Sequence, residues 1–135
     1  MVIRSFRLSD YAAIMEIWKE TGLAYEDMES MDAIAKQLAW DSELVLVAEL
    51  DENVVGVIVG TIDRGRAYFY RLAVLKAYQK RGIGRGLVQA LEERLQKRGA
   101  YQIFIMVNQK NEKVIPFYQS LGYDVERYIT MSKKL

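Results

Sequence analysis

One stretch decides the fold of this chain: QKRGIGRG at residues 79–86. It follows an apolar run that ends at Val74, and it opens a helical pattern that continues to Leu95. A glycine-rich turn before a helix leaves N–H groups of the first helical turn without an intrahelical acceptor, and with the helix dipole these groups favour a bound phosphate. Three basic side chains within the stretch add positive charge. The stretch therefore predicts a seat for a phosphate-bearing ligand.

The spacing of the glycines excludes two common phosphate sites. Gly82, Gly84 and Gly86 give G-x-G-x-G, whereas a dinucleotide-binding fingerprint is G-x-G-x-x-G and follows its strand directly. A Walker loop requires G-K-[ST], and the stretch lacks it. A glycine-rich helix start without any ligand stays open at this point, because isolated glycine patterns are weak signals.

The composition fits one folded domain and excludes several kinds of chemistry. The chain has 135 residues, of which 51% are hydrophobic and 27% charged, so we predict a single domain over residues 1–135. It has no Cys and no His, which removes thiolate nucleophiles, the commonest general base and most transition-metal sites, and we expect no metal. The net charge is +1, so a nucleic acid partner is not expected.

The sequence carries no sign of export or membrane insertion. Residues 1–7 lack the apolar region of a signal peptide. No apolar run approaches the ~20 residues that a membrane span requires. We therefore expect a soluble, cytoplasmic protein without a membrane partner.

Hydrophobic periodicity predicts an α/β (α+β) fold with a mixed central sheet. Strands are expected at residues 2–7, 44–48, 54–60, 67–74, 101–107, 123–127 and 128–135, and helices at about 10–20, 32–40, 83–98 and 111–121. The three middle strands form an antiparallel meander, and the helix after Val74 implies parallel pairing of the strands that it joins. The prediction is thus about six to seven strands with about four flanking helices. Asn111 is expected to cap the last helix, and Pro116 to loosen or kink its start.

A second motif indicates which phosphate the first stretch binds. Residues 111–123 give N-x-x-[AV]-x-x-F-Y-x-x-x-G-Y. Together with Q-x-x-G-x-G at residues 79–84, and with Leu72-Ala73-Val74 before it, this pattern resembles the GNAT family of acyl-CoA-dependent N-acetyltransferases. The resemblance covers most of the chain in the right order and spacing. Over its whole length the chain looks most like short bacterial and archaeal members known by the generic name acetyltransferase.

The resemblance implies a site for acetyl-CoA. In the family the strands that here end near Val74 and Val107 splay apart, and the cofactor's pantetheine arm enters the gap, bonded by the backbone of Leu72, Ala73 and Val74. The loop that holds the pyrophosphate would comprise Gln79, Lys80, Arg81, Gly82, Ile83, Gly84 and Arg85. Asn111 would contact the pantetheine or orient the last helix, and Tyr118 would protonate the departing CoA thiolate.

The chemistry of acetyl transfer agrees with this residue set. The reaction needs a carbonyl held near backbone N–H donors, an amine held in line, and a proton for the thiolate. A tyrosine is mostly protonated at pH 7 and can supply that proton. We therefore expect an N-acetyltransferase in which a primary amine, of a small molecule or a protein, attacks acetyl-CoA directly in a ternary complex. The alternative is a non-catalytic domain that binds or senses acyl-CoA.

The general base is not visible in the sequence. Ribosomal-protein N-terminal acetyltransferases of the family place a Glu where this chain has Met106, and histone-type relatives place one where it has Tyr68. We expect proton removal by ordered water or by an acid of the loop that contains Glu26, Asp27 and Glu29. The acidic loop suggests a cationic amine, although a solvated loop without a role fits equally well.

The candidate substrate residues are Tyr25, Glu26, Tyr68, Tyr70 and Arg71. Arg71 is a charge inside an apolar strand, and strand alternation predicts that it faces opposite to Tyr70 and Leu72. It would either pair with a carboxylate on a covering helix or clamp an acidic group of the substrate or of CoA. The sequence leaves open whether the protein is a monomer or a homodimer.

Overall fold

The computed structural model describes residues 1–23 and 31–135, and for residues 31–34 and 37 it describes the backbone alone. The chain divides into two compact units, residues 1–105 and residues 106–135.

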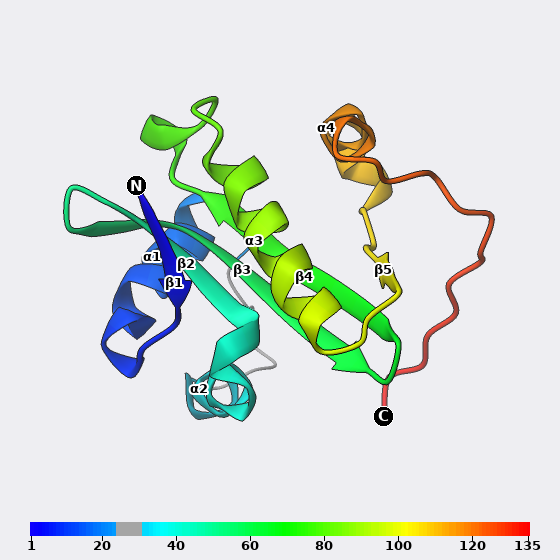
Figure 1. Cartoon of the computed structure of the whole chain (residues 1–135), viewed down its shortest axis with the longest axis horizontal. Coiled ribbons are helices and arrows are strands. Elements are labelled where there is room, and N and C mark those ends of the chain that lie inside the picture. Colours follow the sequence, from blue (N-terminus) through cyan, green and yellow to red (C-terminus); the bar gives the residue numbers. More distant parts are fainter. Residues whose placement is uncertain (24–30) are drawn as a thin grey trace. The chain divides into compact units, whose positions relative to one another are not determined.

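The first unit is built on a five-stranded sheet in the order β1-β2-β3-β4-β5 (Figure 1). The strands are β1 (Val2–Ser5), β2 (Val45–Leu50), β3 (Asn53–Asp63), β4 (Arg66–Val74) and β5 (Gln102–Phe104). Neighbours from β1 to β4 pair antiparallel, and β4 pairs with β5 in parallel. The helices of this unit are α1 (Tyr11–Glu20), α2 (Met31–Trp40) and α3 (Ile83–Lys97). The predicted meander and the parallel crossover through α3 are both confirmed.

Helix α3 lies directly on the backbone of β3. Its buried side chains recur at helical spacing and comprise Ile83, Leu87, Val88, Leu91 and Leu95. Two glycines of β3 leave room for them. A Cβ atom at Gly56 would lie 3.0 Å from Leu87 and 3.3 Å from Ile83, and one at Gly60 would lie 2.9 Å from Leu91. The absence of side chains at these two positions therefore sets how closely the helix approaches the sheet.

Helices α1 and α2 contribute to a second core on the other side of the sheet. This cluster contains Ile14, Ile17, Trp18 and Leu38 from the helices, Phe6 from the chain after β1, and Val45, Val47, Val57, Val59 and Ala73 from the strands. Partly buried Tyr70 packs against it. The sheet is thus covered on both faces, which explains the continuous apolar runs in β2 and β3.

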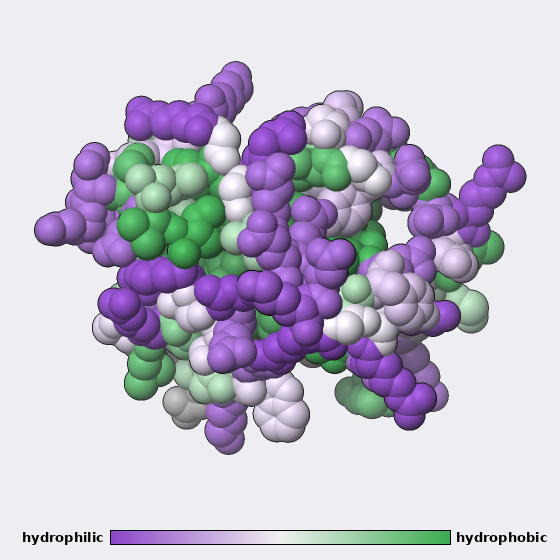
Figure 2. Space-filling view, in the orientation of Figure 1, coloured by the Kyte–Doolittle hydropathy of each residue, from purple (hydrophilic) through white to green (hydrophobic). Residues whose placement is uncertain are grey.

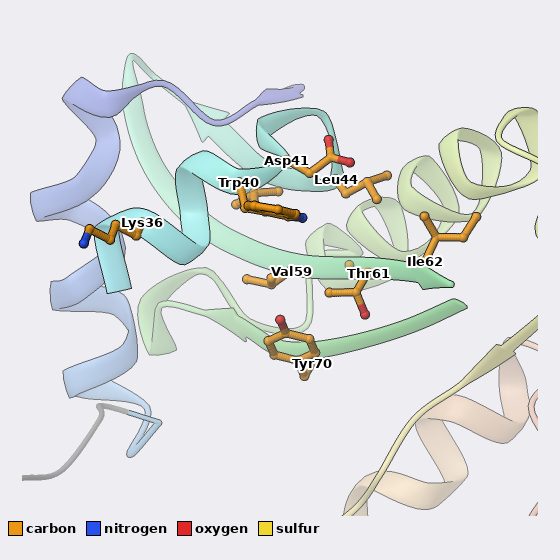
Figure 3. A pocket seen from close by; sticks show the side chains of 10 residues that line it. Lys36, Trp40, Asp41, Leu44, Val59, Thr61, Ile62 and Tyr70 are labelled. Carbon is orange, nitrogen blue, oxygen red and sulfur yellow. The ribbon is translucent and has the colours of Figure 1, made fainter. Parts of the chain in front are cut away.

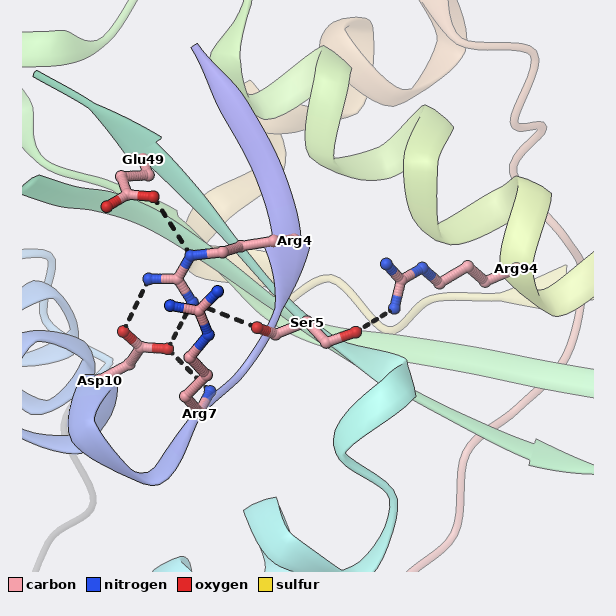
Figure 4. Close-up of polar contacts among 6 residues, drawn as sticks. All are labelled: Arg4, Ser5, Arg7, Asp10, Glu49 and Arg94. Carbon is pink, nitrogen blue, oxygen red and sulfur yellow. Dashed lines mark hydrogen bonds and ion pairs between the residues drawn. The ribbon is translucent and has the colours of Figure 1, made fainter. Parts of the chain in front are cut away.

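A buried ion pair joins β1 to the start of α1 (Figure 4). The Arg4 guanidinium donates to both carboxylate oxygens of Asp10 at 2.8 and 2.9 Å, and its Nε donates to Glu49 at 3.2 Å. The Asp10 carboxylate also accepts from the Arg7 backbone N–H at 2.7 Å. Asp10 stands at the N-cap position of α1 but its side chain makes no cap hydrogen bond to that helix. It closes the preceding 3-10 turn instead.

The surface in the view of Figure 2 is mostly hydrophilic, with apolar side chains gathered over β1 and β2. None of the helices in the described ranges has the length and apolarity that a bilayer crossing requires.

The second unit holds a 3-10 segment (Gln109–Val114) followed by helix α4 (Ile115–Ser120). The two strands predicted at residues 123–127 and 128–135 are not formed, and β5 ends at Phe104 rather than Val107. Side chains in the last segment, such as Val125 and Ile129, are exposed. A pair of strands without an apolar surface to cover gains little stability, which accounts for a sheet of five strands rather than six or seven.

The start of α4 also differs from the prediction. The Asn108 side chain accepts from the Lys110 backbone N–H at 2.9 Å and caps the 3-10 segment. Asn111 lies inside that segment with non-helical angles, φ −120° and ψ 29°, so it does not cap α4. Pro116 stands in the first turn of α4, where the missing N–H group has no intrahelical acceptor to lose. The proline therefore fits the helix start, and the kink lies earlier, at Asn111.

Candidate functional site

Strand β4 carries a bulge at the start of residues 72–74, the segment that is predicted to bind the pantetheine arm of the cofactor. Tyr70 pairs with Val59 and Ala73 pairs with Val57, so two residues of β4, Arg71 and Leu72, stand opposite the one residue between those partners. Arg71 adopts a left-handed backbone conformation with φ 55°. A bulge adds twist and re-aims the groups around it, and bulges are frequent beside binding sites.

The bulge corrects the predicted orientation of Arg71. Its guanidinium lies over the Trp18 ring, 5.5 Å from the centroid, on the side of the sheet where Tyr70 joins the core cluster. Arg71 therefore faces the same side as Tyr70, because the extra residue interrupts strand alternation.

Arg71 and Trp18 hold each other through both backbone and side chain. The Trp18 Nε1–H donates to the Arg71 carbonyl at 3.1 Å, and the Arg71 Nη1 donates to the Leu23 carbonyl at 2.7 Å. Leu23 follows α1 and is the last described residue before the acidic loop. These contacts tie the bulge in β4 to the end of α1.

Beyond the bulge, β4 has one edge without a strand partner in the described part of the chain. Its pairing with β5 runs only from Arg66 with Gln102 to Tyr68 with Phe104, while β4 continues to Val74. The pairing ends after Tyr68 because β5 itself ends at Phe104, so a splay between strands that reach Val74 and Val107 stays a prediction. Ala73 and Val74 bury their side chains, so their backbone groups are what this edge can offer to an extended ligand.

The glycine-rich loop follows this edge after a short 3-10 turn at Lys76–Tyr78. The Gln79 side chain donates to the Val74 carbonyl at 2.9 Å and closes the loop at its base. Lys80 and Gly82 are both left-handed, with φ 64° and 82°. Left-handed residues in a turn direct successive N–H groups toward one concave side, an arrangement that binds anions.

The first turn of α3 faces the same loop. Gly82 is the N-cap residue, and the first helical bond runs from the Gly86 N–H to the Gly82 carbonyl at 3.0 Å. Helix geometry gives the N–H groups of Ile83 and Gly84 no carbonyl within the helix. The buried Ile83 side chain holds this turn on β3. Basic side chains border it at Lys80, Arg81 and Arg85, and the Arg81 guanidinium lies 5.3 Å from the centre of the Tyr78 ring.

Tyr118 and Asn111 lie in the second unit. The Tyr118 ring contacts Phe117 and Tyr123 edge to face, with centroids 5.1 and 6.2 Å apart. Burial raises the pKa of the Tyr118 phenol above its ordinary value of 10.0. The phenol therefore carries its proton at neutral pH. Asn111 is exposed in the 3-10 segment.

Of the candidate substrate residues, Arg71 stands in the bulge of β4, and the other four fall into three groups. Tyr70 lines a cavity of about 370 Å³ in the first unit, described below. Tyr68 instead packs on Phe104 of β5, with ring centroids 5.5 Å apart. Tyr25 and Glu26, with the rest of the acidic loop, lie outside the described residues.

The cavity brings in residues that the sequence interpretation missed. Its described lining consists of Lys36, Trp40, Asp41, Leu44, Val45, Val59, Gly60, Thr61, Ile62 and Tyr70 (Figure 3). The side chain of Trp40 is 90% exposed at the last position of α2. Its offset of two from buried Leu38 already turns it away from the core. A tryptophan turned away from the core at a helix end was the feature of the sequence that could have indicated this cavity.

Comparisons with known proteins agree with one another. The model of the Acetyltransferase (GNAT) family matches residues 11–123. An acetyltransferase of Pectobacterium atrosepticum is 37% identical, and the alignment covers 100% of this chain and 96% of the relative.

Two solved structures share the fold. A putative acetyltransferase from Agrobacterium tumefaciens has a TM-score of 0.81 at 18% identity, covering 99% of this chain and 100% of that one. The PaiA N-acetyltransferase of Thermoplasma acidophilum, in complex with coenzyme A, has a TM-score of 0.82 at 22% identity, covering 93% and 90%. With the loop, the open edge of β4 and the matched motifs, these findings show that the chain belongs to the GNAT family of acetyltransferases.

Proposed function

We propose that this protein transfers an acetyl group from acetyl-CoA to a primary amine. The observation that carries the proposal is the continuity of two features in the first unit. The open edge of β4 ends at Val74, and the loop with left-handed Lys80 and Gly82 follows after one 3-10 turn, is joined to the Val74 carbonyl by Gln79, and leads into α3. An extended acyl carrier with a pyrophosphate at one end matches this sequence of binding groups.

The residues present fit acetyl-CoA. The backbone of Leu72, Ala73 and Val74 would bond the pantetheine arm. The pyrophosphate would lie against residues 79–85, where N–H groups of a helix start and basic side chains supply the charge that an anion requires. Acetyl-CoA supplies a thioester, whose carbonyl accepts an amine without an enzyme-bound intermediate, and this fits a chain without Cys.

Tyr118 is proposed as the general acid. The reaction forms a C–N bond and breaks a C–S bond, the amine loses a proton, and the departing thiolate gains one. A buried phenol with a raised pKa holds its proton at neutral pH and can give it to the thiolate. Asn111 is proposed to contact the pantetheine arm. Because the family match spans residues 11–123, we propose that the two units act as one domain.

The names of the structural neighbours support coenzyme A as the carrier of the acetyl group. They do not narrow the class of amine that accepts it. The neighbour from Thermoplasma acidophilum is described in complex with coenzyme A. Others are described as a ribosomal-protein-S18-alanine N-acetyltransferase and an aminoglycoside acetyltransferase in complex with sisomicin. The second candidate, a domain that binds acyl-CoA without turnover, is favoured by the absence of a Glu at Met106 and at Tyr68.

The two candidates differ in whether CoA is released. The purified protein is mixed with acetyl-CoA and a panel of primary amines, and free CoA is measured beside acetyl-CoA binding by calorimetry. Turnover that depends on the amine supports the transferase. Tight binding without CoA release for any amine supports the sensor.

The cofactor site is tested with Gly84→Glu, which adds a negative side chain at the proposed pyrophosphate seat. The expected result is a loss of acetyl-CoA affinity of at least about 100-fold, because the first-turn N–H groups then face a carboxylate. Gln96→Glu adds the same charge to an exposed position of α3 and should leave the affinity unchanged. If folded Gly84→Glu protein binds acetyl-CoA as well as Gln96→Glu does, the assignment of the loop is wrong.

A further inference from the structure

The cavity beside Tyr70 has a flat aromatic wall and an apolar floor. Figure 3 shows the Trp40 indole edge-on at the end of α2, across from Val59 and Tyr70 on the strands. Leu44, Val45 and Val59 are buried side chains of the floor. A volume of about 370 Å³ exceeds the roughly 150 Å³ that suffices to hold benzene in an apolar cavity. The space between indole and sheet therefore has the shape of a slot for a ring; we call it the ring slot.

Among the side chains of the ring slot that the structure describes, few carry a charge. Its described charged side chains are Lys36 and Asp41. The Asp41 carboxylate already accepts from the Arg98 guanidinium, at 3.0 Å for one of the two bonds. The remaining polar groups are the hydroxyls of Thr61 and Tyr70. A cationic chain finds no uncommitted carboxylate among these side chains, and a sugar ring would place several hydroxyls against Val59 and Leu44 at a cost.

The position of Trp40 gives a second reason to expect a ring. Large aromatic side chains gain most of their stabilisation from burial, and this one is 90% exposed while its neighbour in the chain, Asp41, is held by an ion pair. The indole thus precedes an ion-paired residue and is open to solvent. A flat ring against the indole would remove apolar surface of Trp40, Ile62 and Tyr70 from water, and it would pack on a floor whose side chains, Leu44, Val45 and Val59, expose at most 3% themselves.

The ring slot also lies beside the proposed acetyl site. Tyr70 lines the slot and directly precedes Arg71, where the bulge of β4 begins. The backbone after the bulge, from Leu72 to Val74, is the proposed binding edge for the cofactor arm. An acceptor whose ring occupies the slot can therefore extend a short chain past Tyr70 toward the thioester.

We propose that the acceptor is a primary amine joined by a short alkyl chain to an uncharged aromatic ring, and that the ring occupies the slot between Trp40, Val59 and Tyr70. The statement that the amine is acetylated rests on the proposed function. The statement that an aromatic ring binds in the slot rests on the cavity alone.

The test compares matched amines on the wild-type protein. The probes are 2-phenylethylamine, 2-cyclohexylethylamine, propylamine and glucosamine, each at saturating acetyl-CoA. Burial of an aromatic ring predicts that kcat/KM for 2-phenylethylamine exceeds that for propylamine by about tenfold or more, with the thicker cyclohexyl ring in between. In Trp40→Ala this ratio should fall to within about threefold, and Trp40→Phe should retain most of it. Leu8→Ala removes another largely exposed apolar side chain, 72% exposed and outside the slot, and should keep the wild-type ratio.

A second readout does not need turnover. The chain has two tryptophans, and Trp18 is buried while Trp40 is exposed. Binding of 2-phenylethylamine should protect the fluorescence of Trp40 from acrylamide, and Trp40→Phe should abolish that protection. Protection without turnover for any amine would keep the ring slot and refute the proposed function.

Other outcomes overturn the ring slot. Equal kcat/KM for 2-phenylethylamine and propylamine, an unchanged ratio in Trp40→Ala, or a preference for glucosamine would each do so. The same outcomes accompanied by acetyl transfer to some amine would leave the proposed function standing.

Discussion

Asp10 is a carboxylate whose charge the folded protein depends on. Its side chain and that of Arg4 are 7% and 16% exposed, and hydrogen bonds from Arg4 hold the pKa of Asp10 below its ordinary value. A depressed pKa contributes stability above the unfolded pKa of about 3.9, and this contribution is lost as the pH falls through the folded pKa.

Asp10→Asn is expected to lower the free energy of unfolding at pH 7 by about 3 kcal/mol, because Arg4 then keeps a buried charge without its main partner. Urea denaturation at pH 7 and pH 3 provides the measurement. The variant should lose less stability than the wild type between these two pH values, since it lacks the titrating group. Asp124→Asn, at an exposed position, serves as the control and should behave as the wild type. Equal pH dependence in both variants would contradict the role of Asp10.

Tyr118→Phe is expected to lower kcat by about 100-fold while acetyl-CoA affinity changes little, since general acids contribute on the order of 10² to 10⁴ in rate. Tyr123→Phe removes a hydroxyl from the neighbouring ring and is the matched control. The raised pKa also predicts that the wild-type rate is not lost to Tyr118 ionisation until the pH exceeds 10. Steady-state kinetics from pH 7 to 10.5 checks both statements. A similar kcat for the two variants would remove Tyr118 from the chemistry.

Individual residues were also where prediction from sequence failed. Arg71 was placed on the wrong face because alternation assumes an unbroken strand, and a single left-handed residue is not encoded by any glycine or asparagine there. Asn111 was taken for a helix cap because Asn is a good cap, although Asn108, three residues earlier, makes the capping bond. Both errors concern the backbone conformation of one residue, which short-range composition does not determine.

Helix α3 depends on two glycines of β3, and they support different parts of it. A side chain at Gly56 would press on Leu87 most closely and also on Ile83 in the first turn, whereas one at Gly60 would press on Leu91 in the middle. Gly56→Val and Gly60→Val should each lower the free energy of unfolding by about 1 to 3 kcal/mol through overpacking.

Only Gly56→Val is expected to weaken acetyl-CoA binding strongly, by about tenfold or more, because it displaces the turn that carries the proposed pyrophosphate donors. Urea denaturation and calorimetry on both variants separate stability from binding. Equal losses of affinity would mean that the position of the first turn does not matter for the cofactor.

The helices and strands of the first unit were predictable because each has a clear hydrophobic period or a residue, such as glycine, that marks its end. The apolar runs of β2 and β3, the glycine after α3 and the stripe on α3 all survive in the structure. The exposed segment 123–135 was predicted as strands from its alternation. Alternation shows that a segment could bury one face, but it does not show that a partner surface exists. The ring slot was missed for the converse reason, since a cavity arises between elements and leaves no local pattern.

Across the whole molecule, charge is nearly constant near neutral pH. With no His and no Cys, the sequence has no type of side chain whose ordinary pKa lies between about 6 and 8.5. The free energy of unfolding should therefore stay within about 0.5 kcal/mol from pH 6 to pH 9. Urea denaturation at pH 6, 7.5 and 9 checks this. A steep slope in that range would show that a carboxyl or phenol is strongly perturbed.

For the molecule as a whole, the sequence was most informative about the protein family. The paired motifs at residues 79–84 and 111–123 predicted the GNAT family, and the family match over residues 11–123 confirms it. Residue roles within the site stay predictions, because a motif fixes which residues recur together and not what each one contacts.

The bulge in β4 makes Arg71 the one residue of that strand that the sheet does not need. Tyr70 and Ala73 face the same side with two residues between them, opposite Val59 and Val57 with one residue between them. An in-frame deletion of Arg71 would therefore restore an uninterrupted ladder and leave every other side chain of β4 on its present face. Most deletions inside a central strand turn every later side chain of that strand to the opposite face of the sheet. Deletion of Arg71 should instead leave the core intact. It should remove only the link between β4 and the end of α1.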